Sequence, residues 1–132
     1  MSLFVDASAL VAIIVNEPER EMFRDSILAD SDPLWSAMSC WETVSTVGRA
    51  ERLNPDLARA VVQRTADALA LRIVALGAFE LSTALAAHQK FGRGSGHPAK
   101  LNLGDCFAYA CAKANGAQLL YKGDDFAHTD LG

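Results

Sequence analysis

The sequence lacks an apolar run long enough to cross a membrane, and it has few cysteines. Charged residues are spread along all 132 positions, and no apolar stretch approaches the roughly 18 to 20 residues that a membrane-spanning helix needs. Cys40, Cys106 and Cys111 lie in apolar surroundings without C-x-x-C spacing, which favours reduced thiols over disulfides or a zinc site. The first residues lack a basic segment and reach Asp6 early, as in a first strand rather than a signal peptide. We therefore expect a cytoplasmic protein that does not enter a membrane.

An excess of basic charge is also absent. The net charge is −4, whereas a protein that holds nucleic acid by neutralising phosphates alone is usually basic. An enzyme that contacts phosphates through a bound divalent ion escapes this objection, because the carboxylates that hold the ion make the protein acidic. The charge therefore disfavours a simple nucleic-acid binder and leaves metal-dependent chemistry open.

The chain alternates between strand-like and helix-like segments, without internal repeats or low-complexity regions. The expected order is β-α-α-β-α-α-β-α-α-β, which predicts an α/β fold with three layers, α/β/α, and a mainly parallel sheet of four to five strands. A length of 132 residues predicts one domain, residues 1–132. Two details are expected as well: Ser39 caps the third helix with Glu42 in a capping box, and residues 72–75 form an interior strand.

Acidic side chains follow several of the expected strands or begin a helix. Each has a structural explanation, as a helix cap, a turn residue or a solvated helix face. The carboxyl ends of parallel strands meet at one edge of a sheet, however, so together these acids are expected to face one crevice. Clustered carboxylates repel one another unless a hard cation binds them. The pattern predicts a Mg²⁺-dependent phosphodiesterase, in which Mn²⁺ should substitute. The candidate catalytic residues are Asp6, Glu42, Asp105, Asp124 and Asp125.

Several segments, in the same order along nearly the whole chain, resemble a PIN domain of the VapC toxin type. The most specific are N-L-G-D-C-F-A-Y-A at residues 102–110 and G-D-D-F at residues 123–126. The other similar segments are residues 4–10, 39–42, 119–122 and 129–131.

The resemblance implies a Mg²⁺- or Mn²⁺-dependent ribonuclease of a toxin–antitoxin pair, with a parallel five-stranded sheet. It implies that Asp6, Glu42 and Asp105 belong to the acidic set and that either Asp124 or Asp125 is the fourth member, with Asp125 favoured. We expect Asp6 and Asp105 to hold the metal directly while an activated water attacks RNA, leaving 5′-phosphate and 3′-hydroxyl ends. Expected partners are RNA, a VapB-like antitoxin and a second copy of the chain.

A basic loop, residues 92–100, is the longest irregular segment. We expect Arg93, Lys100 and Lys122 to contact RNA phosphates at the rim of the site. The histidines, His88, His97 and His128, leave open a metal-free ribonuclease mechanism, although no H-x-x-x-H pair is present.

The alternative function is a catalytically silent PIN-like interaction or regulatory module. Such a module would bind a partner through apolar helix faces. For most of the candidate apolar residues, burial in the core is the expected role. These residues are Met22, Phe23, Ile27, Trp35, Met38, Trp41 and Val44. A complete acidic set favours the enzyme.

Overall fold

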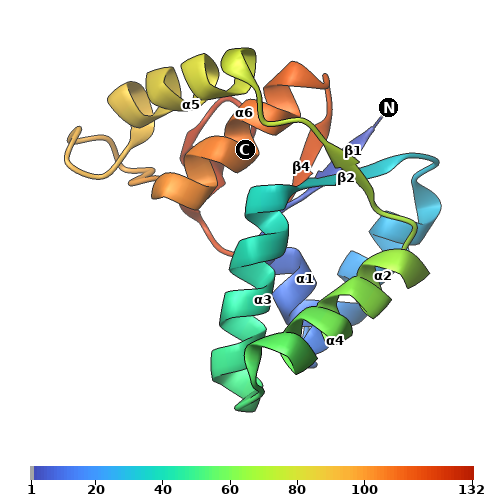
Figure 1. Ribbon diagram of the computed structural model, residues 1–132. Coiled ribbons are helices and arrows are strands. Elements are labelled where there is room, and N and C mark those ends of the chain that lie inside the picture. The colour runs from blue at the N-terminus through green and yellow to red at the C-terminus, as the bar shows by residue number, and fades with distance from the viewer. Residues whose placement is uncertain (1) are drawn as a thin grey trace.

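The computed structural model describes residues 2–132, and its elements follow the order predicted from the sequence (Figure 1). The strands are β1 (Leu3–Val5), β2 (Pro33–Ser36), β3 (Arg72–Val74) and β4 (Gln118–Leu120). The helices are α1 (Ala7–Ile14), α2 (Arg20–Ala29), α3 (Ala37–Glu51), α4 (Pro55–Ala68), α5 (Ala78–Phe91) and α6 (Leu103–Ala114), followed by the short 3-10 helix η1 (Asp125–His128).

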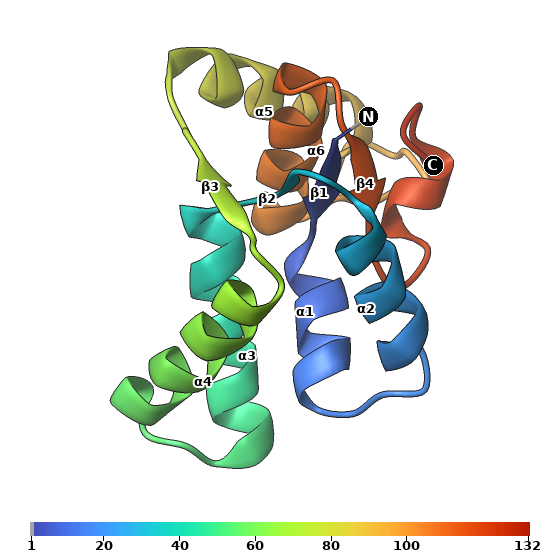
Figure 2. The same ribbon diagram turned by 90° about the vertical axis from the view of Figure 1, so that its right-hand side faces the viewer.

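The four strands form one parallel sheet in the order β3-β2-β1-β4 (Figure 2). β1 lies between two neighbours and pairs Phe4 with Leu34 of β2 and with Leu119 of β4. The predicted α/β fold with a mainly parallel sheet is confirmed. Within residues 2–132 the segment after β4 becomes η1, so the sheet has four strands and not the five that the resemblance implied.

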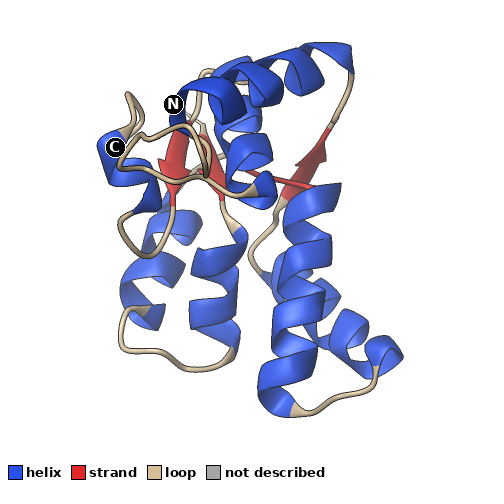
Figure 3. Ribbon diagram, turned by 90° about the vertical axis from the view of Figure 1, so that its left-hand side faces the viewer, coloured by secondary structure: helices blue, strands red, loops and turns tan. Residues whose placement is uncertain are grey.

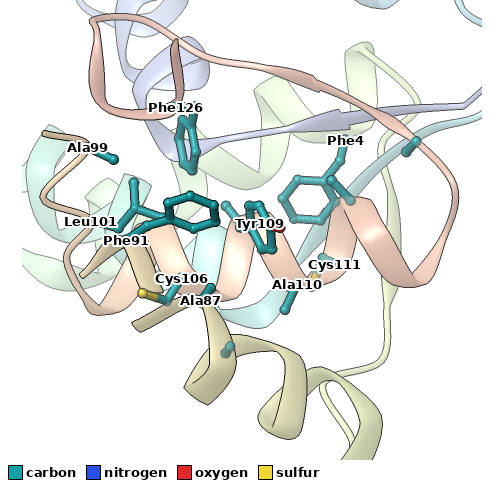
Figure 4. Close-up of a cluster of buried hydrophobic side chains, with 14 of the residues drawn as sticks. Phe4, Ala87, Phe91, Ala99, Leu101, Cys106, Tyr109, Ala110, Cys111 and Phe126 are labelled. Atoms are coloured by element: carbon teal, nitrogen blue, oxygen red, sulfur yellow. The ribbon is translucent and has the colours of Figure 1, made fainter. Parts of the chain in front are cut away.

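Helices cover both faces of the sheet (Figure 3). Phe4 points into a core that it shares with α5 and α6, whereas its neighbours Leu3 and Val5 belong to the core on the side of α1 to α4. Successive residues of a strand point to opposite faces, so an apolar triplet fills both cores. Figure 4 shows the first of these cores, in which Phe126 of η1 packs with Phe91 and Tyr109.

The predicted cap of α3 was wrong. Ser36, not Ser39, is the N-cap: it has extended backbone angles (φ −130°, ψ 169°), and its side chain accepts a hydrogen bond from the backbone N–H of Ser39. β2 runs directly into the helix, so the last strand residue already has the extended conformation that an N-cap needs. Glu42 consequently lies inside the helix and takes no part in a capping box.

One further expectation needs correction. β3 is an edge strand and not an interior one: Ile73 is 58% exposed, and Arg72 pairs with Asp32 across 2.8 Å at the surface. Among the candidate partner-binding residues, Phe23, Ile27 and Trp35 are buried in the core. Met22 and Trp41, by contrast, are exposed.

No helix in the described part of the chain, residues 2–132, has the length and apolar character to span a bilayer.

Phe126 fastens the segment after β4 to the core, and this anchor can be tested. The side chain is 2% exposed, and its ring meets that of Tyr121 at 5.0 Å. Replacing Phe126 by Ala should lower the free energy of unfolding by roughly 3 kcal/mol, because a buried aromatic ring is lost and a cavity remains. Urea unfolding measures this. The same change at exposed His128 of η1 should alter stability by less than about 0.5 kcal/mol, and equal effects at both positions would contradict the anchor.

Candidate metal centre

The sheet topology brings acidic residues from three neighbouring strands to one edge. Asp6 directly follows the central strand β1, Glu42 lies on the helix after β2, and Asp125 lies in η1 after β4. Asp105, in the first turn of α6, is the fourth, since α6 packs against both β1 and α3. The backbone N–H of Asp6 donates to the carbonyl of Leu120 at 3.0 Å, which holds the ends of β1 and β4 together.

These four carboxylates line one cavity of about 490 Å³. Asp124 does not line it; this residue is exposed and immediately precedes η1. The structure thus brings together four of the five candidate acids and separates Asp124 from Asp125. The other polar residues of the lining are Ser8, Glu17, Thr46, Asn102 and Lys122.

Asp6 is fixed by the start of α1. It is the N-cap of that helix and 6% exposed, and its Oδ2 accepts hydrogen bonds from the backbone N–H of Ser8 at 3.0 Å and from the Ser8 hydroxyl at 2.6 Å. The Ser8 hydroxyl also accepts a hydrogen bond from the backbone N–H of Lys122 at 2.9 Å. Ser8 therefore ties Asp6 to the segment that follows β4.

Asp105 is fixed by a capping box at the start of α6. Its backbone N–H donates to the Asn102 side chain at 2.9 Å, and its Oδ2 accepts from the backbone N–H of Asn102 at 3.0 Å. Asn102 is the N-cap, so the helix begins two residues before Asp105, which was expected to open it. The sequence analysis missed Asn102 as part of the site, although an Asn three residues before an Asp is a capping-box signal.

Glu42 reaches the cavity because residue 104 is a glycine. A Cβ atom on Gly104 would overlap the Glu42 carboxylate, so the missing side chain leaves the space that this carboxylate occupies. Gly104 was also missed from sequence, since only the packing of α3 against α6 shows why a helical glycine is needed.

Burial and mutual repulsion raise the pKa values of Asp6, Glu42 and Asp105. Burial, followed by the charges of Asp6 and Asp105, raises the pKa of Glu42 to about 7. Burial also raises the pKa of Asp105 to about 7, with added repulsion from Asp6 and Asp125 and a smaller opposing effect of Arg93. The pKa of Asp6 is raised as well, mainly by burial, against the hydrogen bonds from Ser8. Like charges held close in a low-dielectric site favour protonation unless a cation binds.

The donor set fits a hard divalent cation. All four side chains offer carboxylate oxygens, the ligands that Mg²⁺ prefers. No three His, Cys, Asp or Glu side chains within residues 2–132 lie close enough to form a ready coordination cage. Mg²⁺ usually keeps several water ligands and binds through one or two carboxylates, so an open acidic cavity suits it.

The three residues predicted to contact RNA, Arg93, Lys100 and Lys122, differ in their positions and in their ion pairs. Arg93 and Lys100 line a separate hollow in the loop after α5, and the charge of Arg93 acts on Asp105. Lys122 lines the acidic cavity, but its Nζ is already paired with Glu17 at 2.5 Å and with Glu19 at 3.5 Å. The pairing with Glu17 was not foreseen, since these residues are 105 positions apart.

The histidines stand apart from the acids. None of the three is in the lining of the acidic cavity as described over residues 2–132: His97 lines the loop hollow, His88 an apolar hollow beside α5, and His128 is exposed in η1. This arrangement gives a metal-free histidine mechanism no support.

Comparison with known proteins agrees with this geometry. The sequence matches the PIN domain family over residues 3–131, and the chain belongs to that family. It is 37% identical over 129 residues to ribonuclease VapC42 of Mycobacterium tuberculosis, covering 98% of this chain and 96% of that protein. It is 41% identical over 143 residues to a VapC ribonuclease of Rhizobium meliloti, covering 98% and 99%.

Solved structures share the fold at lower sequence identity. The crystal structure of the Sarcin-Ricin loop cleaving toxin VapC20 of Mycobacterium tuberculosis superposes with a TM-score of 0.70 at 16% identity, covering 95% of this chain and 92% of that one. A toxin–antitoxin complex from Klebsiella pneumoniae also gives a TM-score of 0.70, at 19% identity, covering 99% and 94%. The chain is therefore a PIN domain protein whose relatives in sequence are VapC ribonucleases.

The space at Gly104 yields a test of the Glu42 position. Gly104→Ala should leave the fold intact, because Ala suits a helix better than Gly and the Glu42 carboxylate, at the end of a flexible side chain, can move away. The displaced carboxylate should lower RNA cleavage by about 10²-fold. The control is Gly48→Ala in α3, where a Cβ atom has room beside Ala58 at 3.5 Å. Full activity in both variants, with unchanged melting, would show that Glu42 need not lie where the structure has it.

The raised pKa values predict how stability depends on pH. Glu42 and Asp105 hold protons up to about pH 7 in the folded chain, whereas the unfolded chain releases them near pH 4. The folded state binds more protons between these limits, so the free energy of unfolding should fall as pH rises from about 4 to about 7. Added Mg²⁺ should raise the melting temperature more at about pH 8 than at about pH 5, because the ion needs ionised carboxylates.

Glu42→Gln provides the control for this dependence. Replacing the carboxyl by an amide should flatten the slope between about pH 4 and 7 relative to the unmodified chain. Asp32 and Asp130, whose pKa values are lowered by Arg72 and by Lys113 respectively, act in the opposite direction at lower pH and are unchanged in the variant. Identical slopes for the two proteins would show that the pKa of Glu42 is not raised in the folded chain.

Proposed function

We propose that the protein is an endoribonuclease toxin of the VapC type, which hydrolyses RNA phosphodiester bonds with Mg²⁺, or Mn²⁺ in its place, as cofactor. The observation that carries the proposal is the meeting of Asp6, Glu42, Asp105 and Asp125 in one cavity. Relatives named as VapC ribonucleases, with 37–41% identity over nearly the whole chain, support the same activity.

Each side chain has a role that follows from its position. Asp6 and Asp105, held by Ser8 and by the capping box, are rigid enough to bind a metal ion directly. Glu42 lies in the same cavity, where its carboxylate can hold a water molecule in the shell of that ion. Asp125 completes the acidic set from the side of β4. Ser8 orients Asp6 through the hydrogen bond that its hydroxyl donates.

A divalent ion in this cavity would supply positive charge for the phosphate and lower the pKa of water. Attack of water on phosphorus, with a proton passing to the leaving 3′-oxygen, would give products with 5′-phosphate and 3′-hydroxyl ends. Expulsion of the 3′-oxygen by water needs no 2′-hydroxyl nucleophile, which separates this reaction from metal-free RNA cleavage.

The proposal extends to two protein partners, an antitoxin of the VapB kind and a second copy of the chain. The similarity in fold to a toxin–antitoxin complex supports the first. Exposed apolar side chains, which usually mark interaction sites, support protein partners in general. The largest of them, Trp41 on α3 and Phe79 on α5, are 68% and 62% exposed. Co-expression with the product of an adjacent reading frame, followed by co-purification and mass measurement of the complex, tests both partners.

The activity is tested by removing single charges from the acidic set. Asp105→Asn and Asp125→Asn should each lower the turnover of a single-stranded RNA by at least about 10²-fold, because an amide neither neutralises nor binds a divalent ion as a carboxylate does. Asp124→Asn is the matched control: its neighbour lines the cavity and it does not, so turnover should stay within about twofold. EDTA should abolish cleavage by the unmodified protein, and Mg²⁺ should restore it.

Two results would overturn this assignment. Equal turnover in all three variants would remove the acidic cavity from the reaction. Complete absence of metal-dependent cleavage by the unmodified chain, free of antitoxin and across varied RNAs, would instead favour the catalytically silent interaction module.

A further inference from the structure

The loop that connects α5 to α6 contains a second hollow, of about 580 Å³. Its lining residues are Arg93, Gly94, Gly96, His97, Pro98 and Lys100. In Figure 1 this loop extends beyond the end of α5 and returns to the start of α6. Both charged residues of the hollow are basic, although the chain as a whole has a net charge of −4. A local excess of positive charge in an acidic protein points to an anionic ligand.

The loop is held in shape by its own hydrogen bonds. The Ser95 hydroxyl donates to the carbonyl of Gly92 at 2.6 Å and accepts from the backbone N–H of His97 at 3.2 Å. The base of the loop is closed by the backbone N–H of Leu101, which donates to the carbonyl of Phe91 at 2.9 Å. The His97 ring packs edge-on against the ring of Phe91 at 4.8 Å. The sequence predicted an irregular loop here, and the structure adds that it is internally braced.

Backbone donors remain available on this braced loop. Within residues 2–132, the N–H groups of Gly94, Gly96 and Lys100 have no acceptor in the chain, whereas those of Ser95, His97 and Ala99 do. The same three residues have positive φ angles of 87°, 84° and 52°. Alternation between right- and left-handed backbone regions is how N–H groups come to line an anion-binding concavity.

His97 adds a further donor. Its Nδ1 accepts a hydrogen bond from the backbone N–H of Ala99 at 3.1 Å, so the neutral ring carries its proton on Nε2. The hollow therefore combines a guanidinium, an ammonium, an imidazole N–H and free backbone N–H groups. These are the groups that hold phosphate oxygens in protein complexes with nucleic acids.

The hollow lies next to the acidic cavity along the chain, because Lys100 lines the hollow and Asn102, two residues further on, lines the acidic cavity. The backbone N–H of Arg93 donates to the carbonyl of Leu101 at 3.1 Å, which holds Arg93 beside this segment. We propose that the hollow binds a non-scissile phosphate of the RNA, next to the phosphate that is cleaved. The inference rests on the proposed ribonuclease function and deepens it. The acidic cavity holds the scissile phosphate through a metal ion, and the basic hollow fixes the register of the strand through a neighbouring phosphate.

The test measures cleavage of a short single-stranded RNA by the full chain and by the double variant Arg93→Gln/Lys100→Gln. We expect KM to rise roughly tenfold with kcat nearly unchanged, since these groups bind the substrate away from the reacting atoms. The slope of log affinity against log salt concentration should become shallower by about 0.7, the value of one phosphate contact in single-stranded RNA. The control is Arg64→Gln, an exposed position on α4 outside the hollow, which should change neither quantity.

A modified RNA tests the contact itself. A single neutral methylphosphonate linkage, moved along the strand beside the scissile bond, should raise KM at one non-scissile position in the unmodified protein. The same linkage should have no further effect in the double variant, because the two changes remove the same interaction. Additive effects at every position would overturn the proposal, as would an unchanged KM in the double variant.

Failure of the function and failure of this inference give different results. If the unmodified chain cleaves RNA and the double variant has the same KM and salt slope, only the phosphate contact is refuted. If the unmodified chain does not cleave RNA with Mg²⁺, fluorescence anisotropy with labelled RNA decides the contact: tenfold weaker binding by the double variant supports it, and equal binding or no binding refutes it.

Discussion

The parallel pairing of β1 with both β2 and β4 determines where the acidic residues lie. Because the three strands run in the same direction, the residues that follow them are delivered to one edge of the sheet. Asp6 and Asp125 reach the cavity in this way, and Glu42 does so from the second turn of α3. The pairing in turn depends on the apolar triplet Leu3–Val5, which fills the cores on both faces. A single strand of three residues thus supports both the fold and the site.

The acidic cavity works against the stability of the fold. The pKa values of Glu42 and Asp105 are near 7 in the folded chain. Ionisation of these groups at higher pH therefore lowers the free energy of unfolding. The structure offsets this cost with fixed donors: the Ser8 hydroxyl for Asp6 and the backbone N–H of Asn102 for Asp105. These hydrogen bonds do not remove the repulsion among the four groups. Electrostatic repulsion concentrated in one cavity, in a fold that is stabilised by well-packed cores, is typical of a functional site.

Most of the fold could be predicted from the sequence, since apolar runs and their spacing reflect burial directly. The features that could not be predicted depend on contacts between distant residues. The order of the strands makes β3 an edge strand. The sequence of residues 72–75 does not show which strands lie beside it, so this position could not be predicted. Asp124 and Asp125 are equivalent as sequence, and only the start of η1, anchored by Phe126, turns one toward the cavity. Gly104 and Glu42 are 62 positions apart in number but share one space.

The distribution of charge explains how an acidic protein can act on a polyanion. A negative cavity alone would repel RNA, and a bound divalent ion reverses the sign only over a short distance, because salt screens exposed charges within about 10 Å. Binding of a longer RNA strand requires additional positive groups at the position of the next phosphate. The loop after α5 carries Arg93 and Lys100 shortly before α6, on which Asp105 lies, whereas Lys122 is held by Glu17 and Glu19. In the proposed ribonuclease, this uneven pairing of the basic residues would give the RNA a preferred side of approach, which the net charge of the chain does not reveal.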